Sequence, residues 1–213
     1  MELKAKDGVC FSCLSDIAPV NADGCRFCGR PQTSSSGRCK NCINRHSDID
    51  EFYTAFYYEG PIKNLIKKYK YDNALYLERF LSGYLVNLFK SRISDHFEEG
   101  FIVPLPLHKS KLKKRGFNQS QNLASRLSER VGVKTAPRFL KRVRNTSPQY
   151  TCKRRERFKN IEGAFKASPK CAGHNIILID DISTTGATIQ QAAMVLKKCG
   201  AEKITAVTIA HGR

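Results

Sequence analysis

The sequence has 213 residues, 41% of them hydrophobic and 9% aromatic, which suffices for one large domain or for one domain with a small accessory module. It contains no stretch approaching the roughly 18 uninterrupted apolar residues of a membrane span, and the N-terminal segment MELKAKDGVC lacks the apolar core of a signal peptide. These features argue against membrane insertion, and we expect a cytoplasmic globular protein.

The positive charge is concentrated in one part of the chain. The formal net charge is +18, and residues 105–170 contain 19 lysines and arginines against three acidic residues. A scattered excess of this kind would be read as a solvated surface that keeps the protein soluble. A block this dense favours binding to a polyanion or to a phosphorylated ligand.

The cysteines favour a metal site near the N-terminus. Nine cysteines in a cytoplasmic chain indicate metal binding before disulfides, and six of them form three CxxC pairs within the first 42 residues. Two such pairs complete the tetrahedral site that Zn²⁺ prefers. The strongest combination joins the pair Cys25 and Cys28 to the pair Cys39 and Cys42, because the ten residues between the pairs can form a ribbon turn. Free or redox-active cysteines and iron–sulfur ligation are the alternatives.

The third pair, Cys10 and Cys13, has no obvious partner, since six ligands do not make two four-ligand sites. It could replace either of the other pairs or remain free. The segment has too little apolar content to fold alone, so we expect bound metal to supply its folding energy. Composition becomes aromatic and aliphatic after residue 47, which predicts a zinc-binding module over residues 1–48 and a second domain over residues 49–213.

The second domain is predicted to begin with a strand over residues 52–58 and a helix over residues 60–69, whose lysines form a solvated face. A longer helix, capped by Asp72 or Asn73, is expected to reach residue 91. Its apolar side chains follow helical spacing and are predicted to pack in the core. The lysines are Lys63, Lys67, Lys68 and Lys70, and the apolar side chains are Leu75, Leu77, Leu81, Leu85, Leu88 and Phe89.

A short strand over residues 100–107 is stopped by two prolines, which remove hydrogen-bond donors. A basic loop follows and ends at Arg115, and either Asn118 or Ser120 can cap the next helix. A basic loop before a helix N-terminus is a candidate anion site. Residues 142–157 are strongly basic and are interpreted as a long binding loop or lid, with a merely solvating insert as the alternative.

The C-terminal part predicts a β-α-β unit. Residues 175–179 form an apolar strand, residues 188–199 form a helix with one apolar face, and residues 204–210 form a buried strand. Such a unit requires a right-handed crossover and a parallel sheet.

The connection between this strand and this helix carries the chemistry. Two adjacent carboxylates, Asp180 and Asp181, stand where the strand ends, which is where open α/β sheets bind ligands. The carboxylates can accept hydrogen bonds from ribose hydroxyls, while backbone N–H groups and threonine hydroxyls of the turn hold a 5-phosphate. The turn is neither a Walker A loop nor a Rossmann fingerprint. Its residues are Ser183, Thr184, Thr185, Gly186, Ala187 and Thr188.

The segment IILIDDISTTGAT, residues 176–188, resembles the motif of type I phosphoribosyltransferases that binds 5-phosphoribosyl 1-pyrophosphate (PRPP). Together with VPLPLHKSKLKKRGFNQS, the basic stretch QYTCKRRERFKNIEGAF and the CxxC module, the chain resembles the ComF family of competence-associated proteins over essentially its whole length. The resemblance implies a type I phosphoribosyltransferase-like α/β fold, with a mostly parallel sheet flanked by helices after a small zinc-binding module. Three CxxC pairs, where many relatives have two or four, leave the metal stoichiometry open.

By this resemblance, Asp180 and Asp181 are catalytic and contact the ribose hydroxyls, directly or through Mg²⁺, and residues 183–188 hold the phosphate of PRPP. Pyrophosphate or DNA would be neutralised by basic side chains. The implied function is phosphoribosyl transfer to an unidentified acceptor during DNA uptake, with a competence helicase or other DNA-uptake proteins as partners. The alternative is a non-enzymatic protein that binds single-stranded DNA. The basic residues are Lys109, Arg115, Arg154 and Arg155.

Overall fold

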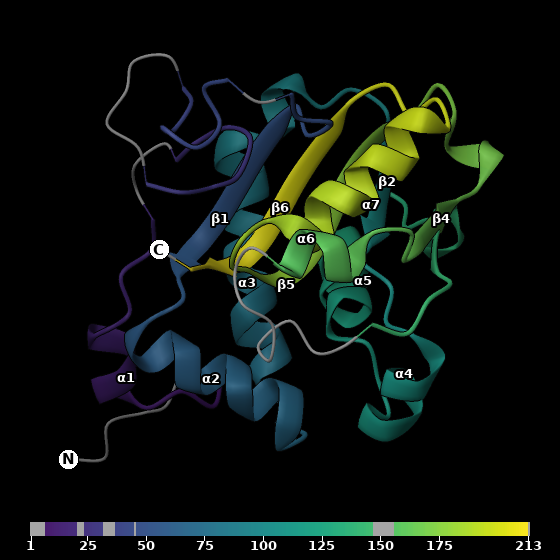
Figure 1. Cartoon of the computed structure of the whole chain (residues 1–213). Helices are drawn as coiled ribbons and strands as arrows, with labels where there is room; N and C mark the ends of the chain where they lie inside the picture. The colour runs from purple at the N-terminus through teal and green to yellow at the C-terminus, as the bar shows by residue number, and fades with distance from the viewer. Residues whose placement is uncertain (1–6, 21–23, 32–36, 45, 147–155, 213) are drawn as a thin grey trace.

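The computed structural model describes residues 7–20, 24–31, 37–44, 46–146 and 156–212. Its centre is a parallel sheet of four strands in the order β1-β6-β5-β2 (Figure 1). The predicted α/β class is therefore confirmed. The strands are β1 (Glu51–Tyr57), β2 (Gly100–Pro104), β5 (Asn175–Ser183) and β6 (Ile204–His211).

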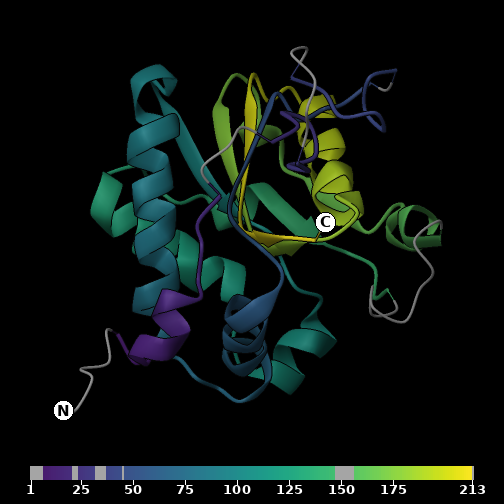
Figure 2. The same ribbon diagram turned by 90° about the vertical axis from the view of Figure 1, so that its left-hand side faces the viewer.

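Helices cover both faces of the sheet, with α3 on one side and α7 on the other (Figure 2). Buried side chains of α2, α3 and α5 share one apolar cluster with Ile177 and Ile179 of β5. Ile176 and Leu178, the alternate residues of the same strand, pack with the apolar face of α7. Burial on both faces explains the continuous apolar run of this strand. The helices are α2 (Gly60–Tyr71), α3 (Leu77–Arg92), α5 (Gln119–Val131) and α7 (Ala187–Lys198).

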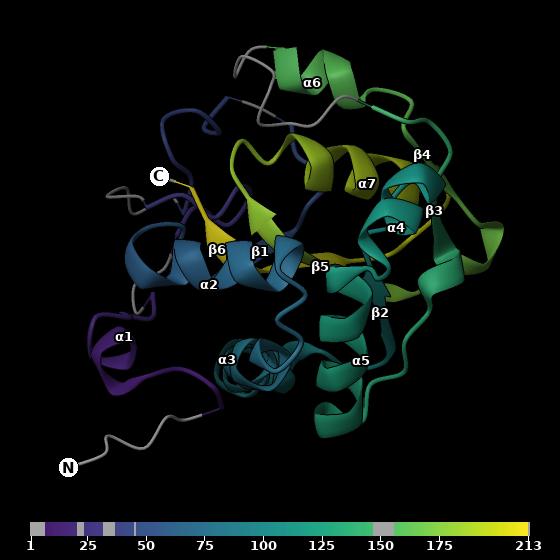
Figure 3. The ribbon, with the colours of Figure 1, turned by 90° about the horizontal axis from the view of Figure 1, so that it is seen from below.

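Smaller elements complete the described part of the chain. The strands β3 and β4 pair as a two-stranded antiparallel sheet. Viewed from below, α2, α4 and α6 surround the edge at which the parallel strands end (Figure 3). The elements are α1 (Phe11–Ser15), α4 (Lys109–Arg115), β3 (Leu140–Arg142), α6 (Glu156–Ile161), β4 (Phe165–Ala167) and the 3-10 helices η1 (Ser94–His96), η2 (Pro137–Phe139) and η4 (Pro169–Cys171).

The predicted β-α-β unit is formed by β5, α7 and β6, but β5 is longer than expected. We expected this strand to end at residue 179, whereas pairing with β6 continues to the match of Ser183 with His211. Asp180 and Asp181 therefore lie within the strand, and the turn shortens to residues 184–186. A longer strand holds the carboxylates more rigidly than a loop would.

The start of α3 was predicted wrongly. Asp72 ends α2 by donating its N–H to the Lys68 carbonyl, and Asn73 adopts a left-handed conformation with φ of 53°. These two residues separate α2 from α3. Leu75 consequently lies in the connection and is 43% exposed, so its predicted place in the core is wrong. The later apolar residues of α3 pack as predicted, with Leu77, Leu81, Leu85 and Phe89 buried.

The described N-terminal residues contact the larger part of the chain in two places. Val9, Leu14 and Ile17 pack against the cluster of α2, α3 and α5. The four-cysteine segments, residues 24–31 and 37–44, lie instead beside β1 at the upper left of Figure 1. The domain boundary at residue 48 stays a prediction. Across the described ranges, none of the helices combines the length and the apolar character that crossing a bilayer requires.

The contrast between two leucines tests this fold. Leu81→Ala removes a completely buried side chain and leaves a cavity, so we expect it to lower the free energy of unfolding by about 2–5 kcal/mol. Leu75→Ala, at the exposed position, should change it by less than about 0.5 kcal/mol. Urea denaturation followed by circular dichroism measures both. Equal losses would contradict the assigned start of α3.

Candidate functional site

The turn after β5 has a conformation fixed by glycine and by neighbouring backbone. Gly186 precedes α7 with a left-handed φ of 77°, a backbone conformation that residues other than glycine rarely adopt. The Gly212 N–H donates to the Ser183 carbonyl at 2.8 Å, and the Ala187 N–H donates to Thr185 Oγ1 at 3.4 Å. The turn thus leads into the N-terminus of a 12-residue helix. Such an N-terminus favours an anion.

The two carboxylates beside this turn contact different helices. Asp181 Oδ1 lies 2.9 Å from Lys70 Nζ of α2, and only 6% of Asp181 is exposed. Asp180 Oδ1 accepts a hydrogen bond from Ser120 Oγ of α5 at 3.0 Å and another from the Asp181 N–H at 2.9 Å. The sheet and two helices therefore hold both carboxylates at one edge.

The two carboxylates differ in how far neighbouring charges compensate them. Burial and the charge of Asp181 raise the pKa of Asp180 to about 7. Burial lowers the pKa of Lys70, but the charge and hydrogen bond of Asp181 outweigh this, and the net shift is upward. Lys70 is thus held as a cation by Asp181, while Asp180 has the less compensated carboxylate. A bound cation would favour its charged form.

The segment RGFNQS, residues 115–120, places Ser120 at Asp180. Asn118 caps α5 by accepting from the Ser120 N–H at 3.2 Å, and its amide nitrogen donates to the Leu105 carbonyl at 3.1 Å. This buried asparagine fastens the start of α5 to the chain just beyond β2. The first turn of α5 therefore belongs to the site, a role that the cap signal alone did not reveal.

Partly buried cations lie near the same edge. Lys111 Nζ donates to the Thr146 carbonyl at 3.0 Å, and Arg142 Nη2 donates to Thr146 Oγ1 at 2.5 Å. Burial lowers the pKa of both side chains, and the charge of Arg142 lowers that of Lys111 further. Among the described residues, Arg142 Nε and Gln119 Nε2 are buried without a hydrogen-bond partner. Buried donors of this kind need an acceptor, which an anionic ligand would supply.

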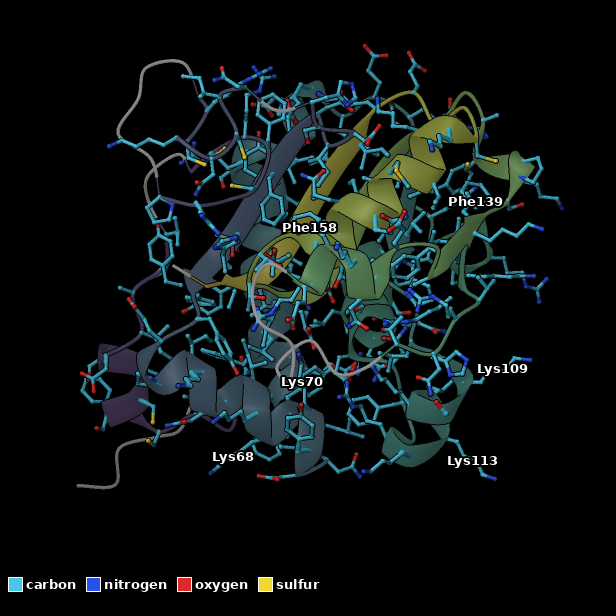
Figure 4. The ribbon with its side chains drawn as sticks, in the orientation of Figure 1. Lys68, Lys70, Lys109, Lys113, Phe139 and Phe158 are labelled. Carbon is cyan, nitrogen blue, oxygen red and sulfur yellow. The ribbon has the colours of Figure 1, made fainter. Side chains whose placement is uncertain are left out.

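Only some of the predicted basic residues lie at the site in the structure. Arg115 donates to Gln119 Oε1 at 2.7 Å, beside these buried donors. Lys109 is exposed at the start of α4 and points away from the sheet (Figure 4). Arg154 and Arg155, with most of the predicted lid, lie outside the described residues.

Several residues of the site escaped sequence reasoning. Lys70 was expected on a solvated face with the other lysines of α2, but 17% of its side chain is exposed and it pairs with Asp181. Arg157 of α6 donates to Thr184 Oγ1 at 2.9 Å. The signal for Lys70 was its place directly after Tyr69, which is completely buried at the end of α2. Lys111, Arg142 and Arg157 lie in the two basic segments that were predicted to bind anions, but no local signal showed which of their side chains reach the site. Ser120 was predicted only as a possible helix cap.

A separate site is formed by the cysteines of the two predicted pairs. The Sγ atoms of Cys25, Cys28, Cys39 and Cys42 all lie within 4.8 Å of one another, and those of Cys28 and Cys39 are 3.7 Å apart. A tetrahedral zinc ion with bonds of about 2.3 Å requires sulfur atoms about 3.8 Å apart. The four thiols therefore fit zinc in number, type and spacing.

Without a metal, the pKa values of two of these thiols shift in opposite directions. A hydrogen bond from Cys28 lowers the pKa of Cys25 to about 4, whereas burial and then the charge of Cys25 raise the pKa of Cys42 to about 12. Four thiolates repel one another unless a cation lies between them. Cys10 and Cys13 are apart from this cluster, because Cys13 packs against the main core. In the part of the chain that the structure describes, no third ligand joins that pair.

A cavity of about 880 Å³ lies elsewhere, between β1, α3 and the four-cysteine segments. Phe52, Tyr84 and His96 line it, and none of residues 180–188 does. The carboxylates and the turn therefore lie apart from this cavity.

Zinc content distinguishes the two kinds of cysteine. Cys39→Ser removes one of the four clustered ligands, so we expect this variant to lose most of the bound zinc. Cys10→Ser, the matched control, should retain about one zinc per chain, since Cys10 lies outside the cluster. Metal analysis of the purified proteins measures this. Loss of zinc in the Cys10 variant would place that cysteine at the metal.

Comparison with known proteins agrees with this geometry. A family model described as "Phosphoribosyl transferase domain" matches residues 112–213. The match therefore begins within α4 and includes Ser120, Asp180, Asp181 and the turn before α7.

Relatives extend the similarity to the N-terminal residues. The chain is 31% identical to "Competence protein ComFC" of Bacillus subtilis, covering 97% of this chain and 85% of that protein. It is 27% identical to "Competence protein F" of Haemophilus influenzae, over 94% of this chain and 89% of the relative. It is 28% identical to "DNA utilization protein YhgH" of Escherichia coli K12, over 92% and 87% of the two chains. The identity to ComFC over nearly the whole length shows that the chain belongs to the ComF family.

Proposed function

We propose that this protein binds PRPP at the edge formed by β5, the turn of residues 184–186 and α7. The observation that supports the proposal most is the juxtaposition of Asp180 and Asp181 with this turn. PRPP carries ribose hydroxyls, which the carboxylates could bind, and a 5-phosphate, which the turn could bind. The buried donors of Arg142 and Gln119 offer partners for the pyrophosphate. Arg157, which already contacts Thr184, adds a cation beside the 5-phosphate.

Mg²⁺ would bind with this ligand. Asp180 is the carboxylate suited to hold it, because neighbouring groups compensate its charge only in part. Mg²⁺ is a hard cation that prefers oxygen ligands such as this one. When bound, Mg²⁺ would neutralise charge on the pyrophosphate oxygens. Asp181 would keep its orientation through Lys70, and Ser120 would orient Asp180.

The reaction class that such a site supports is phosphoribosyl transfer. The bond between C1 of the ribose and a pyrophosphate oxygen breaks, and pyrophosphate leaves with the bonding electrons. An acceptor nucleophile forms the new bond to C1 and loses its proton. The protein would contribute positioning and electrostatic stabilisation, for which Lys111, Arg115 and Arg142 provide positive charge at the leaving group. The acceptor is not identified by the site.

A role in DNA uptake is the biological part of the proposal. The relatives are named for competence and for DNA utilization, which supports this role for a member of the same family. We place the protein in the cytoplasm, with zinc in the four-cysteine module of residues 1–48 and with the phosphoribosyltransferase-type domain over residues 49–213. A competence helicase or another DNA-uptake protein is the proposed partner.

Binding of single-stranded DNA is the second candidate function. Exposed lysines on α2 and α4 favour it: Lys109 and Lys113 point outward from α4, and Lys68 points outward from α2 (Figure 4). Phe158 of α6 is 45% exposed and could stack on a base. In this reading the fold is a scaffold, and the polyanion follows the lysines instead of entering the carboxylate site.

Calorimetric titration with PRPP tests the first function. In the presence of Mg²⁺ we expect saturable heat for the wild type and a loss of affinity of about 10- to 100-fold in Arg142→Gln, the effect of losing charged hydrogen bonds. The double variant Asp180→Asn and Asp181→Asn should lose Mg²⁺-dependent binding. Lys113→Gln is the matched control, because this lysine is exposed and should leave PRPP affinity unchanged. No heat with millimolar PRPP would contradict the proposal.

Salt dependence tests the second function. The double variant Lys109→Gln and Lys113→Gln should weaken retention of single-stranded DNA and reduce the slope of log affinity against log salt by about 1.4. The Asp180 and Asp181 double variant should retain DNA like the wild type. Fluorescence anisotropy with a labelled oligonucleotide measures both. Wild-type protein without salt-dependent retention would exclude DNA binding.

A further inference from the structure

The segment that contains Cys25 and Cys28 contacts residues that are bonded to the two ends of the turn that we propose for phosphate binding. Gln190, in the first turns of α7, extends its side chain to the segment between Cys25 and Cys28. Its Nε2 donates to the Phe27 carbonyl at 2.8 Å. The same amide nitrogen lies 3.2 Å from Ser47 Oγ, so Gln190 joins α7 to two parts of the N-terminal segment.

Gln190 is also bonded directly to the turn. Its backbone N–H donates to the Gly186 carbonyl at 2.8 Å, and a side chain at Gly186 would meet Gln190 Cγ. Movement of the Phe27 carbonyl would therefore reach Gly186 through one residue. This is the C-terminal end of the turn.

The other end is reached through β6. Gly29, next to Cys28, packs so closely that a Cβ there would lie 2.5 Å from the Phe52 ring and 3.3 Å from His211 Cδ2. His211 is completely buried, and the following residue, Gly212, donates its N–H to the Ser183 carbonyl at 2.8 Å. Gly212 also lies against Thr184.

The order of the cysteine segment depends on its own backbone bonds and on its metal. Cys25 donates its N–H to the Arg30 carbonyl at 2.7 Å, and the Gly29 N–H donates to the Cys25 carbonyl at 2.7 Å. These bonds form a tight turn that presents two thiols to the cluster. Four clustered thiolates would repel one another without a cation between them, so the position of Phe27 and Gly29 should depend on metal occupancy.

We propose that the metal-bound segment of residues 25–30 positions the turn of residues 184–186, and that Gln190 is the positioning residue that couples metal occupancy to this turn. The inference rests on the proposed phosphate and zinc sites, yet the coupling itself is a property of this chain and needs no bound PRPP. Since coupling between two sites is reciprocal, a ligand at the turn would also raise the affinity for zinc.

Amide hydrogen exchange measured by mass spectrometry tests the coupling without any ligand. The zinc-loaded full chain is compared as wild type, as Gln190→Ala and as Gln191→Ala, a matched control on the same helix. We expect exchange in residues 184–190 to be roughly three- to tenfold faster in Gln190→Ala, the effect of about one lost hydrogen bond. Gln191→Ala should match the wild type, and exchange in α3 and α5 should be unchanged in both.

Chelation of zinc by EDTA completes the test. Exchange in residues 184–190 should rise in the wild type and should rise less in Gln190→Ala, where the connection is already broken. Equal exchange in the two zinc-loaded proteins would overturn the inference, as would a wild type whose turn is unaffected by chelation. If chelation unfolds the whole chain, the comparison of zinc-loaded variants decides alone. Failure of PRPP to bind would remove the proposed function without affecting this result.

Discussion

The structure depends on two adjacent carboxylates at the end of a central strand, one buried and one partly buried. Because β5 continues through Asp180 and Asp181, both charges lie beside packed helices and need partners. Lys70 of α2 neutralises Asp181, and Ser120 at the start of α5 donates to Asp180. The helices that cover one face of the sheet thus also complete its charged edge. Asp180, less fully compensated, is where a ligand or its cation gains the most.

This constraint explains which features could be predicted from the sequence. The β5 motif, its turn and the four clustered cysteines are local patterns, in which residue order nearly determines geometry. Lys70 could not be assigned in this way, and Arg142 was predicted only as part of a basic segment, since each meets the site only when distant elements pack together. Leu75 illustrates the opposite failure. It was grouped with the apolar residues of the helix, but the left-handed Asn73 places it outside the helix. Membership of the family came from the combination of motifs, whereas the interaction between the cysteine segment and α7 needed coordinates.

The cysteine segment gives the molecule a second structural centre that contacts the first. In a small metal site, the metal supplies order that the short chain cannot obtain from apolar burial. Contacts from Phe27 and Gly29 lead to the two ends of the turn through Gln190 and His211. In the coupling that we propose, a metal module in this arrangement would support the ligand site as well as its own fold. The N-terminal cysteines would then have a role within the α/β domain, beyond that of an independent appendage.

The central claim is that the turn before α7 holds the phosphate of a ribose 5-phosphate unit. The most direct measurement is a titration of the isotopically labelled protein with ribose 5-phosphate, followed through its backbone amide resonances. The account predicts saturable shifts of residues 184–188, with Asp180 and Asp181 affected by the sugar and the exposed lysines of α4 unaffected. Shifts confined to α2 and α4, with no change in the turn, would contradict it and would identify the molecule as a binder of anions at its basic surface alone.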